Sequence, residues 1–248
     1  MMQRDEYLAH LARDGGRMAT LARGDLDVAV PTCPDWTLRD LIEHTGQVHR
    51  WQTEAARHDH GAFPPEETLS GGPAEGQSLA DWFAEGVDNA VTTMSTVSPD
   101  ATRWTWAKGT GDVAQWYFRR IAQETLVHRI DAELAAGVDI TEVDPVFAAD
   151  GLSEMFEMFV PLATGQPING DGRTLHLHAT DSDTDAEWML TLHPDRVDVA
   201  RGHGKGDAAV RGRALDLLLL SWGRDPLEPV EQFGDDDVIA TFRAAAKI

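Results

Sequence analysis

The chain has 248 residues, 42% of them hydrophobic and eight of them tryptophan, which is enough to bury the core of one large or two modest domains. Its formal charge of −21 repels phosphate and argues against binding to nucleic acid or to a membrane surface. No apolar run is long enough to cross a bilayer, the N-terminus does not resemble a signal peptide, and the single cysteine, Cys33, fits a reducing compartment. We therefore expect a cytoplasmic protein.

The first part of the chain has helical periodicity. Residues 5–23 form the first candidate helix. The second follows "CPDWTLRD", where Thr37 can cap the helix and Asp40, three residues later, can reach back to the cap. The third follows "GQSLAD", where Ser78 and Asp81 repeat this pattern and apolar residues then recur at helical spacing.

A fourth and longer helix is predicted over residues 112–136. Gly137 is expected to end this helix, because glycine readily adopts the left-handed conformation found after helix C-termini. Four amphipathic helices of this length predict a four-helix bundle, which we assign to residues 1–140.

The remaining chain, residues 145–248, mixes helical and strand patterns. A short helix is expected first, followed by four strands and a helix that packs on them. The first helix is predicted over residues 145–159 and the second over residues 213–224. The strands are predicted over residues 173–181, over residues 187–202 as two strands around a turn, and over residues 206–212. The expected fold class is α+β with two domains, the second a small α+β domain with an antiparallel sheet.

Glu124 and His128 are polar residues on a helix face that is otherwise suited to the bundle interior. With 100° per residue, this face also carries Tyr117, Ile121 and Asp131. The opposite side, which we expect to face water, carries Arg119, Arg129 and Glu133. A Glu/His pair at this spacing is often a surface ion pair. Inside a bundle, however, an ionised carboxylate needs a partner, and one neutral imidazole is a poor one.

The second helix offers that partner. His44 lies in the middle of an inward seam with the alternating four–three spacing of packed helices, formed by Thr37, Leu41, His44, Val48, Trp51 and Ala55. His49 lies away from this line, so we expect it at the surface or rim. A lone seam histidine can be a hydrogen-bonded core residue. Together, His44, Glu124 and His128 form a three-ligand set that leaves positions open on a zinc-like ion, as reactive metal sites do.

Other candidate sites are weaker. His176 and His178 share one face of a predicted strand, and a solvent-facing or cleft-facing surface is favoured over a metal pair. Cys33 precedes a helix start, which can lower a thiol pKa, but a packed small residue is the better interpretation. The segment "GHGKGD" lacks the strand-to-helix context of a phosphate-binding loop.

The stretches "VPTCPDWTLRDLIEHTGQVHRW" and "QETLVHRIDAELAAG" resemble the mycothiol-dependent maleylpyruvate isomerase family of actinobacteria, and the arginine-rich composition suits that source. The resemblance implies a DinB-like four-helix bundle that holds a divalent metal, usually zinc, through His44, Glu124 and His128. The segments "LHLHATD", "EWMLTLHPDRVDV" and "RGRALDLLLLSWGRDP" resemble the smaller C-terminal domain of that family.

The resemblance also implies a chemistry. The metal would lower the pKa of the thiol of mycothiol, the thiol cosubstrate. The thiolate would then add reversibly to the cis double bond of maleylpyruvate, or it would attack another electrophile in an S-transfer. Arg224 resembles a functional arginine of the family that would bind the substrate and stabilise charge. Arg211 and Arg213 lie nearby in the sequence, and a salt-bridge role is the alternative for Arg224.

Two further residues have open roles. Tyr117 would line the cavity and help to bind the thiol, or simply pack. Asp131 would accept a hydrogen bond from a ligand histidine or bind a neighbouring helix end. The competing interpretation of the whole chain is a non-catalytic, metal-containing ligand-binding or regulatory protein. The oligomeric state stays open, a monomer included.

Overall fold

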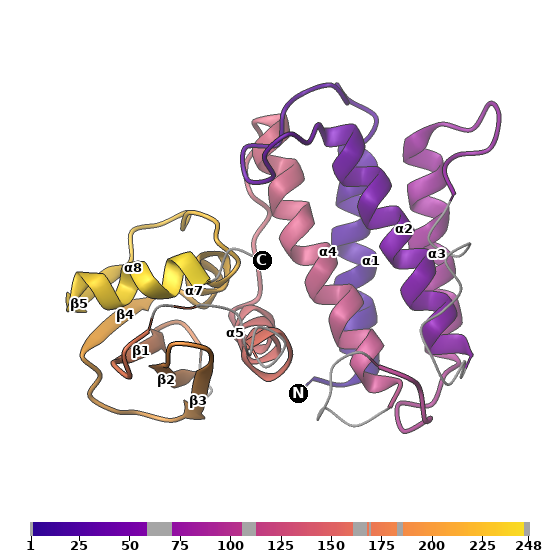
Figure 1. The fold of residues 1–248 in the computed structure, drawn as a ribbon. Coiled ribbons are helices and arrows are strands. Elements are labelled where there is room, and N and C mark those ends of the chain that lie inside the picture. Colours follow the sequence, from indigo (N-terminus) through magenta and orange to yellow (C-terminus); the bar gives the residue numbers. More distant parts are fainter. Residues whose placement is uncertain are drawn as a thin grey trace. The chain divides into compact units, whose positions relative to one another are not determined.

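The structure is a computed structural model that describes residues 2–58, 71–105, 113–160, 168, 170–182 and 186–245. The chain divides into two units, residues 1–141 and residues 142–248 (Figure 1). The first unit is helical and the second combines helices with a sheet, so the predicted α+β fold class is confirmed.

Four long helices build the N-terminal unit: α1 (Arg4–Leu21), α2 (Leu38–Arg57), α3 (Leu79–Ser95) and α4 (Gln115–Ala136). α1 and α2 each contact both α3 and α4, which closes the predicted four-helix bundle (Figure 1). Fully buried apolar side chains fill its interior, among them Tyr7, Leu11, Leu41, Phe83, Tyr117, Phe118 and Ile121.

The helix ends follow the chemistry of their sequences. The Thr37 hydroxyl accepts a hydrogen bond from the Asp40 amide at 3.3 Å, and Asp40 Oδ2 accepts one from the Thr37 amide at 2.8 Å, which forms the predicted capping box of α2. The Ser78 hydroxyl caps α3 by accepting from the Asp81 amide at 3.1 Å, but Asp81 Oδ2 accepts from the Ser78 hydroxyl at 2.7 Å instead of from its amide, so the predicted capping box is not completed. Gly137 ends α4 with a φ of 65°. The predicted start of α4 at residue 112 lies outside the described residues.

The prediction that the polar face of α4 points toward water is wrong. Arg119, Arg129 and Glu133 are 4%, 0% and 0% exposed. α4 contacts both α1 and α2, so more than one of its faces is covered. A buried face of charged residues resembles a solvated one in sequence, since only the partners on another helix reveal that the charges are paired.

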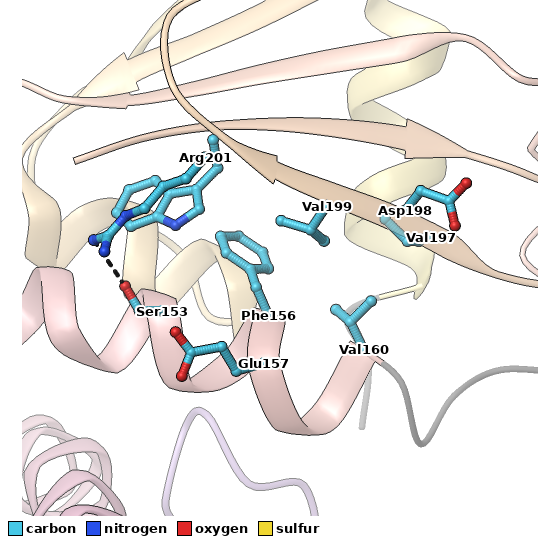
Figure 2. Close-up of a pocket in the computed structure, with 9 residues that line it drawn as sticks. Ser153, Phe156, Glu157, Val160, Val197, Asp198, Val199 and Arg201 are labelled. Atoms are coloured by element: carbon cyan, nitrogen blue, oxygen red, sulfur yellow. Dashed lines mark hydrogen bonds between the residues drawn. The ribbon is translucent and has the colours of Figure 1, made fainter. Parts of the chain in front are cut away.

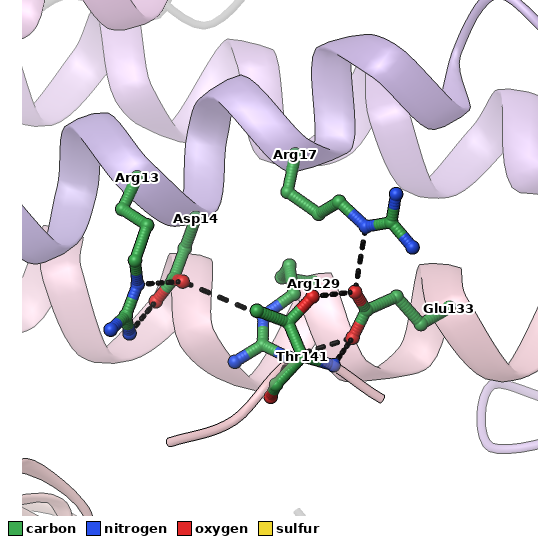
Figure 3. A network of polar contacts seen from close by, with 6 residues as sticks. All are labelled: Arg13, Asp14, Arg17, Arg129, Glu133 and Thr141. Carbon is green, nitrogen blue, oxygen red and sulfur yellow. Dashed lines mark hydrogen bonds and ion pairs between the residues drawn. The ribbon is translucent and has the colours of Figure 1, made fainter. Parts of the chain in front are cut away.

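Figure 3 shows the charged and polar partners of Arg129 and Glu133. Arg129 Nη1 donates to Glu133 Oε2 at 2.6 Å and to the Thr141 carbonyl at 2.8 Å, while Arg17 Nε on α1 donates to Glu133 Oε1 at 2.8 Å. Asp14 Oδ1, also on α1, lies 3.6 Å from Arg129 Nε. Burial raises the pKa of Glu133, but the hydrogen bonds from Thr141, Arg17 and Arg129 outweigh it and lower the pKa. The network fixes α4 to α1 and to the chain that follows α4.

The C-terminal unit begins with α5 (Pro145–Glu154), which continues into a π-helical turn, η2 (Met155–Phe159). Its strands are β1 (Thr174–Ala179), β2 (Glu187–Leu192), β3 (Val197–Arg201), β4 (Ala208–Gly212) and β5 (Glu231–Gly234), and its later helices are α7 (Ala214–Ser221) and α8 (Asp236–Ala245). The strands form one sheet in the order β3-β2-β1-β4-β5. Three of the pairings are antiparallel, but β1 and β4 are parallel, so the sheet is mixed and not purely antiparallel as predicted.

Two elements after residue 224 were not predicted. β5 is a short edge strand whose residues are all exposed, so it lacks the alternation that marks a half-buried strand. α8 buries Val238, Ile239 and Phe242, a spacing that was available in the sequence. α7 and α8 both contact β1 and β4, so they cover the same part of the sheet.

Among the residues that the structure describes, no helix combines the length and the apolar character that a membrane crossing requires.

Candidate metal centre

Three side chains from two helices of the bundle meet around one carboxylate oxygen. His44 Nε2 on α2 lies 3.5 Å from Glu124 Oε1 on α4, and His128 Nε2, one turn further along α4, lies 3.3 Å from the same oxygen. Two ligands that bind zinc at 2.0–2.2 Å in tetrahedral geometry are separated by about 3.4 Å. The two distances in the cluster therefore match the spacing that a tetrahedral ion needs, and the predicted residues fit a divalent metal.

His128 is oriented by a second carboxylate. Asp131 Oδ2 lies 3.0 Å from His128 Nδ1, and the Asp131 side chain is fully buried. The Thr32 hydroxyl donates to Asp131 Oδ1 at 2.6 Å, and Cys33 Sγ lies 3.7 Å from Oδ2. Because Nδ1 donates to a carboxylate, Nε2 is the nitrogen of His128 that is left to bind a metal after losing its proton, and it faces Glu124. Asp131 thus accepts hydrogen bonds both from the histidine and from the loop before α2.

The charge around Glu124 keeps it ionised. Arg120 Nη2, one turn earlier on α4, donates to Glu124 Oε2 at 2.8 Å and leaves Oε1 to the histidines. Burial raises the pKa of Glu124, but Arg120, His128 and His44 together hold it well below its usual range. Burial likewise lowers the pKa of His128, but the hydrogen bonds with Asp131 and Glu124 raise it to about 9. Without a metal, the two carboxylates therefore hold a second proton on His128.

A tryptophan from the loop before α2 forms one wall. The Trp36 ring centroid lies 4.9 Å from that of His44 and 6.5 Å from that of His128. The turn that presents it needs Asp35 in the left-handed region, with φ of 68°, a conformation that non-glycine residues adopt rarely. Strain of this kind is tolerated where the surrounding contacts fix the turn.

A cavity of about 460 Å³ opens beside His44. It is lined by Asp35, Trp36, Asp40, Glu43, His44 and Gln47. Three of these residues carry carboxylates, and none of them is lysine or arginine. The mouth of the site is therefore acidic, which disfavours anionic ligands at this point.

His49 was predicted at the surface or rim of the bundle, but it lies in the bundle interior. It is 0% exposed, its Nε2 lies 2.8 Å from Thr125 Oγ1 on α4, and its ring packs on Phe83 of α3 with centroids 5.3 Å apart. The Thr125 hydroxyl donates to the Ile121 carbonyl at 2.6 Å, so it accepts from His49 Nε2–H. Burial lowers the pKa of His49 to about 3, which makes it a neutral core residue.

Tyr117 packs in the interior of the bundle. It is fully buried, its hydroxyl donates to the Trp104 carbonyl at 2.5 Å, and its ring packs edge-on against Trp116. Burial raises the pKa of Tyr117.

Arg224 lies just after α7 in the C-terminal unit, where its Nη1 donates to the Trp222 carbonyl at 2.8 Å. Two arginines near it in the sequence form ion pairs: Arg213 Nε lies 2.7 Å from Asp216 Oδ2, and Arg211 Nη1 lies 3.6 Å from Glu231 Oε2.

A second cavity, of about 480 Å³, belongs wholly to the C-terminal unit and was not predicted (Figure 2). It lies between the helix α5–η2 and the strands β2 and β3, with Phe156, Val160, Val197 and Val199 among its apolar walls. Arg201 supplies its cation: the guanidinium donates to Ser153 Oγ at 3.1 Å and lies 5.5 Å from the centre of the Trp188 ring. No motif in the sequence marks this cavity, because its walls come from separate segments.

Comparisons with known proteins agree with this architecture. Residues 8–133 match the model of the mycothiol maleylpyruvate isomerase N-terminal domain, and residues 147–241 match that of the C-terminal domain of the same family. A crystal structure of a histidine-to-alanine mutant of the mycothiol-dependent maleylpyruvate isomerase is similar, with 15% identity, 93% of each chain covered and a TM-score of 0.58. A crystal structure of the mycothiol-dependent maleylpyruvate isomerase gives 17% identity, the same coverage and a TM-score of 0.54. No curated protein sequence matches significantly. With both domain models matched in order along the chain, the protein belongs to the mycothiol maleylpyruvate isomerase family.

Proposed function

We propose that the protein is a metal-dependent enzyme that uses mycothiol as its thiol cosubstrate, either for a cis–trans isomerisation like that of maleylpyruvate or for S-transfer to another electrophile. The observation that carries the proposal is the pair of 3.3 and 3.5 Å separations between two histidine nitrogens and one Glu124 oxygen. The family membership supports the choice of thiol and of reaction class.

The residues have distinct roles in this proposal. His44, Glu124 and His128 would hold the divalent metal, and their donor set is one that zinc prefers. When bound, the metal supplies the Lewis acidity that turns a thiol into a nucleophilic thiolate near neutral pH. Asp131 keeps the proton of His128 on Nδ1, and Arg120 keeps Glu124 ionised and its Oε2 occupied.

The acidic mouth favours S-transfer as the second candidate function. Asp35, Asp40 and Glu43 line the cavity beside His44, so an electrophile without negative charge enters it at lower electrostatic cost than a dicarboxylate. Maleylpyruvate would instead need a cation from elsewhere in the chain. Arg224 is our proposal for that cation, and its guanidinium would bind a substrate carboxylate.

The test is a parallel assay of the zinc-loaded chain with mycothiol. One arm contains maleylpyruvate and follows the loss of its absorbance. The other contains chlorodinitrobenzene, a neutral electrophile from which the thiolate displaces chloride. We expect turnover in one or both arms, and we expect Glu124→Gln to abolish it. Glu43→Gln, which removes a carboxylate of the mouth and not of the ligand set, should retain it. A metal-loaded protein inactive with both electrophiles would favour the non-catalytic alternative.

The role of Arg224 is tested separately. Arg224→Ala should raise the KM for maleylpyruvate and leave the KM for the neutral electrophile unchanged. Arg211→Ala is the matched control, because Arg211 is half-exposed and pairs with Glu231. An equal effect of both substitutions would contradict the proposed carboxylate contact.

A further inference from the structure

A second cluster of histidines lies on the sheet of the C-terminal unit. Leu175 and Leu177 of β1 are fully buried, and His176 and His178 alternate with them on the other face of the strand. In the register with β2, His178 lies directly opposite Glu187. His176 is only 7% exposed, so of the two predicted positions, solvent-facing and cleft-facing, the first does not apply to it.

The loop between β3 and β4, residues 202–207, carries the third histidine onto this face. Gly202 has a φ of 128°, which an L side chain rarely adopts. A Cβ on Gly206 would lie 2.6 Å from the Ala208 carbonyl and 3.1 Å from the His176 amide, so only glycine lets the loop lie this close to β1. The glycines of "GHGKGD" thus place His203 over the strand.

These residues converge on one carboxylate. Glu187 Oε2 lies 2.8 Å from His176 Nε2 and 2.7 Å from His203 Nδ1, and Oε1 lies 3.7 Å from His178 Nε2. The rings of His176 and His203 are nearly perpendicular, with centroids 5.3 Å apart. One potential ligand atom from each of His176, Glu187 and His203 lies within 4.8 Å of the other two.

The chemistry of the cluster is that of a metal site. An ionised carboxylate with two or three imidazoles is a donor set for zinc-like ions. The nitrogen–oxygen distances are now hydrogen-bond lengths, and an ion would spread them to about 3.4 Å. His203 can supply this movement, since its side chain is 80% exposed on a loop.

We propose that His176, Glu187 and His203 form a second divalent metal site, with His178 within reach as a fourth ligand. The ion would tie the loop of residues 202–207 to β1 and β2 on the face of the sheet opposite the buried leucines of β1. This site is made of residues of the C-terminal unit alone and does not depend on the function proposed for the bundle.

The test counts metal ions in two backgrounds. The tag-free chain is stripped with a chelator and titrated with Zn²⁺ against a chromophoric competitor. The wild-type chain should bind two equivalents. A His44→Ala/Glu124→Gln variant, which lacks two ligands of the bundle site, should still bind one equivalent. Adding His203→Asn to this variant should weaken that remaining binding by about tenfold or more.

The matched control is His193→Asn. His193 also belongs to the C-terminal unit and pairs with a carboxylate, its Nε2 lying 2.8 Å from Asp198 Oδ2, but it is outside the cluster. This substitution should leave zinc binding unchanged. Circular dichroism identifies a variant that fails to fold, and Glu187→Gln then provides an independent removal of a ligand. The proposal is overturned if the bundle-site variant binds no zinc, or if His203→Asn and His193→Asn bind it equally well.

Discussion

Substitution of Asp131 by asparagine tests how the bundle site is oriented. Asp131 is fully buried and lies 3.0 Å from His128 Nδ1, while its other oxygen accepts from Thr32 at 2.6 Å. Asparagine keeps the size of the side chain but removes the charge, so the imidazole becomes less basic and its orientation is less well fixed. Loss of such a partner typically lowers metal affinity by about 10- to 100-fold, or about 1.4–2.7 kcal/mol.

The assay is the same competition titration with Zn²⁺, at one fixed pH, on the chelator-stripped Asp131→Asn protein. Asp14→Asn is the matched control, because Asp14 is an equally buried carboxylate of the bundle that pairs with Arg13 and Arg129 rather than with a candidate ligand. It should leave zinc affinity unchanged. Unchanged affinity in Asp131→Asn, or an equal loss in Asp14→Asn, would refute the idea that Asp131 orients a metal-binding histidine.

Three further predictions concern stability. Arg129→Met should lower the free energy of unfolding by about 3–5 kcal/mol in urea titrations, because it leaves Glu133 buried without its main cation. His49→Gln should flatten the acid dependence of stability in the metal-free protein. In the unfolded chain His49 takes up a proton below its ordinary pKa of 6.5, whereas in the folded protein it does so only near pH 3. The free energy of unfolding of the wild type therefore decreases as the pH falls from 6.5 to 3, by up to about 1.4 kcal/mol per pH unit. Gly46→Ala should cost about 1–3 kcal/mol, seen as a lower Tm, because its Cβ would meet the Trp82 ring.

Each of these has its own control. Arg13→Met removes a half-exposed partner of Asp14 and should have a much smaller effect than Arg129→Met. For His49, equal slopes of stability against pH in the two proteins would mean that the histidine is not held neutral. Gly16→Ala adds a Cβ with no atom within 4 Å and should stabilise α1 by about 0.5–1 kcal/mol, so a destabilised Gly16→Ala would contradict the packing argument.

Helical periodicity was sufficient to predict which residues of the bundle meet at the candidate metal centre. His44, Glu124 and His128 lie on regular helices, and the spacing along a helix decides which face a side chain occupies. Asp131 follows for the same reason, since it lies one turn after His128. The wall formed by Trp36 could not be predicted, because its position depends on the left-handed Asp35 and on a loop with no repeating pattern.

The failures have a common cause in contacts between distant segments. His49 was misplaced because α2 packs against both α3 and α4, so a residue off the predicted seam is still covered. Arg129 and Glu133 resembled a solvated face, because their partners Arg17 and Asp14 lie on α1. The parallel pairing of β1 with β4 is likewise a choice of partner that alternation within each strand does not encode.

The central claim is that one cation binds where three side chains of the bundle converge. Anomalous diffraction at the zinc edge from crystals of the zinc-loaded protein tests it most directly. The account predicts a peak about 2.0–2.2 Å from His44 Nε2, His128 Nε2 and a Glu124 oxygen. A zinc-loaded crystal with no peak between these three groups would contradict it.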